Sequence, residues 1–228
     1  MPPQLQATIQ TNLLTDTWVA ATWDEYLALV NDPIYAKAKC YFHDGYMRVE
    51  TMPVSTNHAL DNGIIYFAVN LFCTLQGIPA QGLINCSYRK KEVRECQPDV
   101  SYYVGDRVKL ATRSNSVIDL DDLSAPDLAI EVANTSLNDD LGQKRLLYEE
   151  MGIAEYWVVD VQNALIFAFA IANQGSYRIH QSKVVSGLAI ATLQEALSMS
   201  RTKSQSEVGS WLMKQFQIAS ESKPVSQA

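Results

Sequence analysis

Apolar residues recur at helical spacing in one long segment and in several short ones, which predicts helices of different lengths. Over residues 58–76, Ile64 and Leu71 share one side of a helix, Ser55 caps its start and Gly77 marks its end. Further helices are predicted over residues 22–30, 140–151, 194–199 and 201–217.

Alternating and continuous apolar runs predict strands between these helices. Asp44-Gly45, a pair typical of tight turns, joins two such runs into a hairpin. Two runs on either side of a polar turn at 90–92 are expected to be antiparallel neighbours, and residues 128–161 are expected to form strand, helix and strand. The polar segment 105–125 is long enough to be an active-site or recognition loop. The expected strands are 39–43, 46–50, 83–89, 93–104, 128–133, 154–161, 165–172 and 177–181.

The length of 228 residues fits one domain with added termini, because single cores are usually complete at about 100–200 residues. A hydrophobic fraction of 47% with 19% charged residues supplies a substantial core and excludes an intrinsically disordered protein. We expect an N-terminal extension over residues 1–21, the main domain over 22–200, and a C-terminal helix with a flexible tail over 201–228.

Sequence signals predict a cytoplasmic protein with no membrane association. No stretch reaches the roughly 20 apolar residues of a membrane span, and residues 1–18 lack the features of a secretory signal. The cysteines form no CxxC pair and sit in apolar or extended segments, which favours reduced thiols over disulfides or zinc ligands. These residues are Cys40, Cys73, Cys86 and Cys96.

The formal net charge of −7 limits how the chain can meet nucleic acid. Proteins that grip duplex DNA mainly by neutralising phosphates are usually basic. Three possibilities follow: a local basic strip contacts nucleic acid, divalent cations carry the positive charge at the site, or nucleic acid is not the partner.

Three acids fall on or beside predicted strands, and their spacing selects one pair. Asp99 is expected in the middle of strand 93–104, whereas Asp127 and Glu131 fall at the start and middle of the next strand. At a rise of about 3.3 Å per residue, Asp127 and Glu131 are about 13 Å apart at Cα, but Asp99 and Glu131 on adjacent strands can lie about 5 Å apart. The competent pair is therefore Asp99 with Glu131. The alternative role for Asp99 is a turn position, whereas Asp127, which follows Pro126, is interpreted as positioning the start of its strand in preference to catalysis.

Two carboxylates that share one site fit the oxygen-rich coordination of Mg²⁺, which leaves positions for water. On apolar strands the same pair is poorly solvated and self-repelling, so Glu131 needs a cation or a basic side chain nearby. Lys144 is the candidate, because helical spacing places Asp140, Lys144 and Tyr148 on one face. The alternative is a structural ion pair between Glu131 and Lys144.

Five stretches occur in a fixed order along the chain: 86–89 (CSYR), 97–101 (QPDVS), 125–132 (APDLAIEV), Lys144 with Tyr148, and 152–160 (GIAEYWVVD). Together they resemble the Uma-two family of restriction-endonuclease-like proteins, a branch of the PD-(D/E)xK nuclease superfamily. The likeness runs from about residue 23 to about residue 197, and it is the combined order and spacing that is specific.

The resemblance implies an α/β (α+β) fold with a restriction-endonuclease-like mixed β-sheet flanked by helices, and a metal-dependent phosphodiesterase centre. It implies that Asp99 and Glu131 are ligands of Mg²⁺ or Mn²⁺, together with the backbone carbonyl of Val132. The lysine that the superfamily carries two positions after the second acid falls here at Ala133, which cannot orient or deprotonate a water. Lys144 of the next helix would supply the ammonium instead, as in members with a migrated lysine.

Four further residues are assigned a secondary role at this site. Glu50 and His58 match a recurrent acid and histidine region of the family, although His58 also fits a helix-terminal position. Asp127 and Tyr148 are the other secondary candidates.

DNA is the substrate that the resemblance implies, and local basic residues are the candidates to contact its phosphates. Solvated turns are the alternative reading of the same residues. We expect a homodimer, since cutting both strands of a duplex is most simply done by two centres. The basic candidates are Arg89, Lys90, Lys91, Arg94, Arg107, Lys109 and Arg113.

Three functions stay open at this point. The first is a metal-dependent endonuclease, and the second is a catalytically weakened nuclease-fold module that binds nucleic acid or protein, which Ala133 and the acidic charge favour. The third, a small-molecule enzyme on another α/β fold, is weaker because the sequence has no Gly-rich phosphate loop and no GxSxG nucleophile motif.

Overall fold

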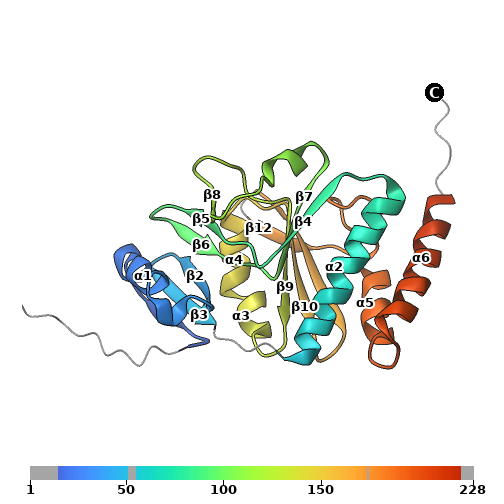
Figure 1. Cartoon of the computed structure of the whole chain (residues 1–228), viewed down its shortest axis with the longest axis horizontal. Coiled ribbons are helices and arrows are strands. Elements are labelled where there is room, and N and C mark those ends of the chain that lie inside the picture. The colour runs from blue at the N-terminus through green and yellow to red at the C-terminus, as the bar shows by residue number, and fades with distance from the viewer. Residues whose placement is uncertain (1–14, 51–54, 174, 222–228) are drawn as a thin grey trace, which may run out of the picture.

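The computed structural model describes residues 15–50, 55–173 and 175–221, with the side chains of 219–221 left out (Figure 1). The expected flexible end of the chain at 222–228 and most of the expected N-terminal extension lie outside the described residues. The helices are α1 (Trp23–Val30), α2 (Thr56–Gln76), α3 (Leu137–Leu141), α4 (Gln143–Glu150), α5 (Ile190–Met199) and α6 (Gln205–Glu221), with 3₁₀ turns η1 (Pro33–Tyr35) and η2 (Gly105–Leu110).

The strands form two sheets, and the sheets are joined by segments that leave one and enter the other. The first sheet contains β1 (Trp18–Ala20), β2 (Lys39–His43), β3 (Tyr46–Glu50), β5 (Tyr88–Lys90), β6 (Arg94–Cys96) and β8 (Ile118–Asp119). The second, central sheet contains β4 (Ala80–Ile84), β7 (Val100–Val104), β9 (Leu128–Ala133), β10 (Glu155–Asp160), β11 (Leu165–Ala172) and β12 (Gly175–Arg178).

The central sheet is mixed and is covered by helices on both faces (Figure 1). Its order is β12-β11-β10-β9-β7-β4, in which β9 and β10 run parallel and the other neighbours are antiparallel. Alternation along β9 sends Ile130 and Val132 toward α2, α5 and α6, and it sends Ala129 and Ala133 toward α4. Glu131 lies between these two alanines at alternate positions, so its side chain is on the same face of the sheet. The expected fold class of a mixed sheet flanked by helices is confirmed.

The first sheet carries the predicted hairpin of β2 and β3. Asp44 and Gly45 at its turn have φ values of 50° and 75°, as two-residue hairpin turns of this kind require. One side of the hairpin packs Phe42 and Val49 with Tyr26 of α1 into a small core of its own. The sheet order is β1-β3-β2-β6-β5-β8, so residues 18–20 of the expected extension add an edge strand.

Several expected elements differ from the structure for local reasons. The expected strands 83–89 and 93–104 are antiparallel neighbours, but each divides in two: β4 pairs with β7 in the central sheet and β5 with β6 in the first. The breaks fall at Asn85, whose φ is 51°, and at Pro98, which has no N–H for a sheet ladder. Asp99 therefore lies directly before β7 and not in the middle of a strand.

The helices also shift relative to the expected ranges. The helix expected over 140–151 begins at Leu137 and is interrupted at Gly142, where an added Cβ would lie 2.8 Å from the Asn138 carbonyl oxygen. Helix α5 begins at Ile190, four residues earlier than expected. The sequence did not reveal this start because the N-cap residue, Ala189, has no side chain that can cap a helix.

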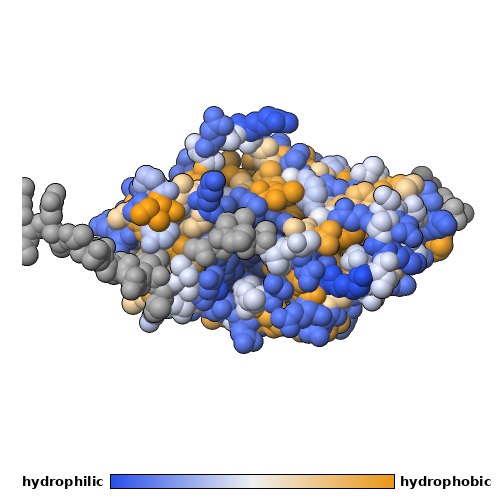
Figure 2. All heavy atoms as spheres, turned by 60° about the horizontal axis from the view of Figure 1, so that its bottom comes forward, coloured by the Kyte–Doolittle hydropathy of each residue, from blue (hydrophilic) through white to orange (hydrophobic). Residues whose placement is uncertain are grey.

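The surface seen from below in Figure 2 is mostly hydrophilic, with hydrophobic residues in separate patches. Among the described residues, no helix is both long and apolar enough to cross a bilayer. All four cysteines carry free thiols, and burial raises the pKa of Cys73 to about 11.

A buried ion pair ties α2 to the chain that leaves α5. Asp61 of α2 is 0% exposed, and its Oδ1 and Oδ2 lie 2.6 and 2.7 Å from the two terminal guanidinium nitrogens of Arg201. The same guanidinium donates to the carbonyl of Val161 at 2.8 Å. The pair therefore joins a helix, the segment after α5 and the end of a central strand.

Replacing Arg201 by Met leaves the Asp61 carboxylate buried without its partner. We expect the free energy of unfolding to fall by about 3 kcal/mol, near the low end for a broken buried pair because the arginine is itself partly exposed. Urea denaturation measures the change. The Asp61→Asn/Arg201→Met double variant should recover part of the loss, and a single-variant loss below about 0.5 kcal/mol would contradict the role of the pair.

Candidate active site

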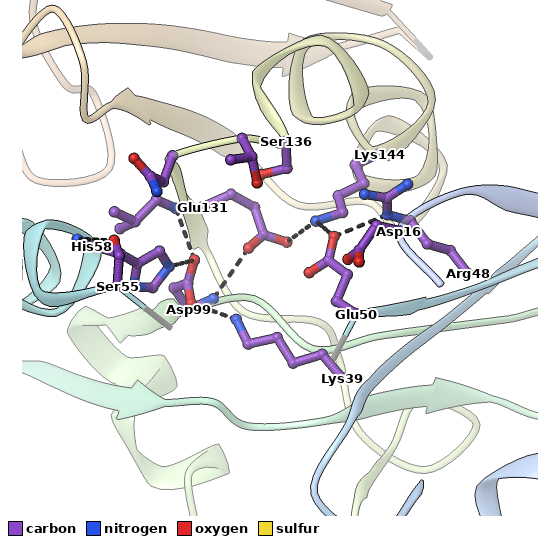
Figure 3. Close-up of a pocket in the computed structure, with 13 residues that line it drawn as sticks. Asp16, Lys39, Arg48, Glu50, Ser55, His58, Asp99, Glu131, Ser136 and Lys144 are labelled. Atoms are coloured by element: carbon purple, nitrogen blue, oxygen red, sulfur yellow. Dashed lines mark hydrogen bonds and ion pairs between the residues drawn. The ribbon is translucent and has the colours of Figure 1, made fainter. Parts of the chain in front are cut away.

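A polar pocket of about 250 Å³ opens where the first sheet meets the central sheet and the start of α2 (Figure 3). Strands β2 and β3 supply one wall, β9 and the segment before β7 supply the floor, and α2 and α4 supply the remaining sides. The lining residues are Asp16, Lys39, Arg48, Glu50, Ser55, His58, Asp99, Glu131, Val132, Asn134, Thr135, Ser136 and Lys144.

The two predicted acids meet in this pocket, where each carboxylate accepts a hydrogen bond from a backbone amide. The Asp99 N–H donates to Glu131 Oε2 at 3.3 Å, and the Val132 N–H donates to Asp99 Oδ2 at 2.8 Å. The register of β7 against β9, with Val100 opposite Ile130, places Asp99 beside Glu131. Each carboxylate is thus fixed by an amide of the other segment.

Asp99 is held by two basic side chains as well. Its Oδ1 forms an ion pair with Lys39, and its Oδ2 lies 3.3 Å from His58 Nε2. Burial raises the pKa of the Asp99 carboxyl, but Lys39 and His58 together outweigh burial and hold this pKa below its usual range. Asp99 is therefore ionised at neutral pH despite being buried.

Glu131 is 2% exposed and sits among hydroxyl groups. Its Oε1 accepts from the Tyr148 hydroxyl at 2.7 Å and from the Tyr41 hydroxyl at 3.2 Å. The pKa of Glu131 is raised to about 8, because burial and the nearby carboxylates of Asp99 and Asp140 outweigh the lowering effect of Lys144 and Lys39. Two neighbouring carboxylates therefore have opposite shifts, a pattern typical of catalytic and binding centres.

Lys144 is 1% exposed and is fixed by carboxylates on three sides. Its Nζ lies 2.6 Å from Glu50 Oε1, 2.9 Å from Asp140 Oδ1 and 3.8 Å from Glu131 Oε1. Burial lowers the pKa of Lys144, but Asp140, Glu131 and Glu50 raise it above its usual range. The ammonium therefore stays charged, and the predicted face of Asp140, Lys144 and Tyr148 points at Glu131.

Beside the predicted Glu50, the hairpin supplies three residues that sequence reasoning missed: Lys39, Tyr41 and Arg48. Lys39 lies opposite Glu50, and Tyr41 lies opposite Arg48, so these four share one face of the two strands. Arg48 Nε donates to Glu50 Oε1 at 2.9 Å, and one terminal guanidinium nitrogen of Arg48 lies 3.2 Å from Asp139. The polar residues at alternate positions in both strands were the available signal.

The secondary candidates separate into two groups. Glu50 and His58 line the pocket, and Tyr148 touches Glu131 from beside it. Asp127 does not reach the pocket: its carboxylate accepts from the Val104 N–H at 2.8 Å and forms an ion pair with Arg107. These contacts fit the interpretation of Asp127 from the sequence, positioning at the start of a strand.

The residues expected to contact DNA lie away from this pocket. Arg89 pairs with Glu95, and a guanidinium nitrogen of Arg94 lies 2.9 Å from Glu150 Oε2. Lys90, Arg94 and Arg107 line a second pocket, of about 360 Å³, next to Glu150. The remaining candidates, Lys91, Lys109 and Arg113, are exposed.

The oxygen atoms of the pocket can be compared with those that a divalent cation requires. Among the described residues, no three His, Cys, Asp or Glu side chains gather in a way that holds a metal ion. A carboxylate has about four acceptor positions, two on each oxygen, and the contacts above leave one open on Asp99 Oδ1 and one on Glu131 Oε2. Because Mg²⁺ is commonly held by one or two carboxylates with water and substrate phosphate, this donor set fits it.

Comparisons with known proteins find similarity to proteins described as putative nucleases. The sequence profile of the Uma2 family, described as "Putative restriction endonuclease", matches residues 23–217. A solved structure described as a putative nuclease belonging to DUF820, from Anabaena variabilis, is similar with a TM-score of 0.50 at 18% sequence identity. The likeness covers 84% of this chain and 98% of that one, and at this identity it shows the fold. No curated protein matches the sequence.

The raised pKa of Glu131 makes the stability of the metal-free protein depend on pH. The folded protein keeps a proton on Glu131 that the unfolded chain releases above its ordinary pKa of 4.5, so unfolding becomes easier as pH rises from 4.5 toward about 8. The Glu131→Gln variant lacks this loss. We expect its stability relative to wild type to rise by up to about 1.4 kcal/mol per pH unit in that window.

Urea denaturation in the presence of a chelator, at intervals between pH 5 and pH 8, measures this difference. The exposed Glu195→Gln substitution is the control and should keep a constant difference from wild type. A constant difference for Glu131→Gln as well would mean that Glu131 is ionised throughout the range.

Proposed function

Because the chain belongs to the Uma2 family of restriction-endonuclease-like proteins, we propose that it is a metal-dependent endonuclease that hydrolyses DNA phosphodiester bonds. The observation that carries the proposal is the meeting of Asp99 and Glu131, from separate segments, beside the buried ammonium of Lys144. A pair of linked carboxylates with opposite pKa shifts in a polar pocket favours catalysis over a purely structural role.

Asp99 and Glu131, with the backbone carbonyl of Val132, are the residues that would hold Mg²⁺ or Mn²⁺. When bound, such a cation lowers the pKa of a water and offsets negative charge on the phosphate under attack. The amides of Asp99 and Val132 hold the two carboxylates in place, so little rearrangement of the acids is needed.

Lys144 takes the role that Ala133 cannot fill. Glu50 and Asp140 fix its ammonium 3.8 Å from Glu131 Oε1, so the ammonium could orient a water held beside this acid. Tyr148 and Tyr41 hold Glu131 Oε1 and leave Oε2 toward Asp99. We assign Lys144 to orienting the nucleophile, and Glu50, His58 and Tyr148 to positioning the groups around it.

The negative charge of the chain and of the pocket indicates that a cation is needed when DNA binds. The pocket is lined by four acids and by three lysine or arginine residues, and the whole chain has a net charge of −7. A phosphate gains little from such a surface unless a divalent ion adds positive charge. We propose that Lys90, Lys91 and Arg113, with Arg89 and Arg94, contact the DNA backbone outside the pocket, and that two copies of the chain act on a duplex.

A nuclease-fold module that binds without hydrolysis is the second candidate. The observation in its favour is that Lys144 is 1% exposed and already engaged by Glu50 and Asp140. Activity of matched variants separates the two candidates.

We expect wild-type protein with Mg²⁺ to cleave supercoiled and linear DNA, and Asp99→Asn or Lys144→Met to be slower by about 10²-fold or more, as when a charge-stabilising group is lost. A gel assay with a chelator control measures cleavage, and circular dichroism checks that each variant is folded. Equal cleavage by all three proteins would indicate a contaminating nuclease and would favour the binding module.

Metal binding should also be visible without DNA. A ligand that binds only the folded state raises the melting temperature, so millimolar Mg²⁺ or Mn²⁺ should raise that of wild type by a few degrees. The shift should be absent in Asp99→Asn and retained in Asp127→Asn, whose carboxylate lies outside the pocket. Thermal denaturation by circular dichroism measures it, and equal shifts in both variants would place the metal elsewhere.

A further inference from the structure

Lys39 reaches from the first sheet into the central one and ends on an acid of the candidate metal site. It stands on β2 opposite Glu50 of β3, and its Nζ forms an ion pair with Asp99 Oδ1 (Figure 3). The side chain of Lys39 is 13% exposed, so the pair is close to solvent but largely enclosed.

Lys39 contacts the one Asp99 oxygen that has room for a cation. The other oxygen, Oδ2, already accepts from the Val132 N–H and lies beside His58. A cation at Oδ1 would sit about 2.1 Å from that oxygen, which is the usual Mg²⁺–oxygen distance, and would lie within a few ångströms of the Lys39 ammonium. The two positive charges repel strongly in a buried site, so they compete for Asp99.

The two lysines of the pocket differ in how firmly they are held. Lys144 is 1% exposed and lies within 3 Å of two carboxylates, Glu50 and Asp140. Lys39 forms its ion pair with one carboxylate, Asp99, and its side chain is 13% exposed. Lys39 is therefore the lysine that can leave its carboxylate at the smaller cost.

We propose that Lys39 is a built-in counter-ion of Asp99 that a divalent cation must displace, and that the displaced ammonium then binds a phosphate oxygen of the substrate backbone. The inference rests on the proposed function and adds a substrate-contacting residue from the first sheet. An incoming phosphodiester supplies the anion that Lys39 loses, so metal and DNA should each strengthen the binding of the other.

Isothermal titration calorimetry of the full chain with Mn²⁺ tests the displacement. Lys39→Met removes the competing charge and should bind Mn²⁺ at least tenfold more tightly than wild type. Lys39→Arg keeps the charge and holds Asp99 with a forked guanidinium, so it should bind Mn²⁺ several-fold more weakly than wild type. Lys37→Met, an exposed substitution two residues away, should leave the affinity unchanged.

A second titration tests the phosphate contact. A short duplex with phosphorothioate linkages keeps the backbone charge and resists hydrolysis. Its addition should tighten Mn²⁺ binding by both proteins, because the cation attracts the phosphate directly, but it should do so several-fold more in wild type than in Lys39→Met. Equal tightening in the two proteins would overturn the phosphate contact.

The inference is supported if Lys39→Met binds Mn²⁺ most tightly, wild type less tightly and Lys39→Arg most weakly. Any other order among folded variants overturns it. If Lys39→Met does not fold, the comparison of wild type with Lys39→Arg still decides, because equal or tighter binding by the arginine variant is contrary to displacement. Unaltered Mn²⁺ affinity in the variants together with DNA cleavage by wild type removes the inference and leaves the proposed function standing. No Mn²⁺ binding and no cleavage by any of the proteins removes both.

Discussion

The rest of the site depends on two hydrogen bonds between the segment before β7 and strand β9, one from the Asp99 amide to Glu131 and one from the Val132 amide to Asp99. They bring two buried carboxylates together where the chain leaves the first sheet and enters β7 of the central one. Such a pair is stable only with positive charge nearby. One lysine comes from the hairpin and the other from α4, so neutralising the acids also fastens both elements to the central sheet.

Local patterns in the sequence were enough for the elements that frame the pocket. Helical periodicity predicted α2, and Asp44-Gly45 predicted the hairpin, because both features are encoded by neighbouring residues. Strand spacing predicted the pairing of Asp99 with Glu131, and the resemblance added the expectation that the two acids hold a metal ion. The break of the expected strand 93–104 at Pro98 was not foreseen, although proline in a strand is a local signal that its ladder is interrupted.

What the sequence left out depends on contacts between distant segments. Lys39 and Arg48 alternate with apolar residues and were visible as polar positions, but only the packing of the two sheets shows that their face meets Asp99. The basic residues near position 90 looked like a strip because they are close in sequence. In the structure Arg94 pairs with Glu150, more than fifty residues away, and this partner could not be found by spacing.

The cross-strand pairing of Lys39 with Glu50 has a consequence for how the two sheets can move. These side chains carry opposite charges and lie opposite each other on the same hairpin. If the hairpin tilts away as a rigid unit, it withdraws two cations, Lys39 and Arg48, and one anion, Glu50, so the pocket loses one net positive charge. Opening between the sheets therefore separates charge, because it breaks the ion pairs of Lys39 with Asp99, of Arg48 with Asp139 and of Glu50 with Lys144.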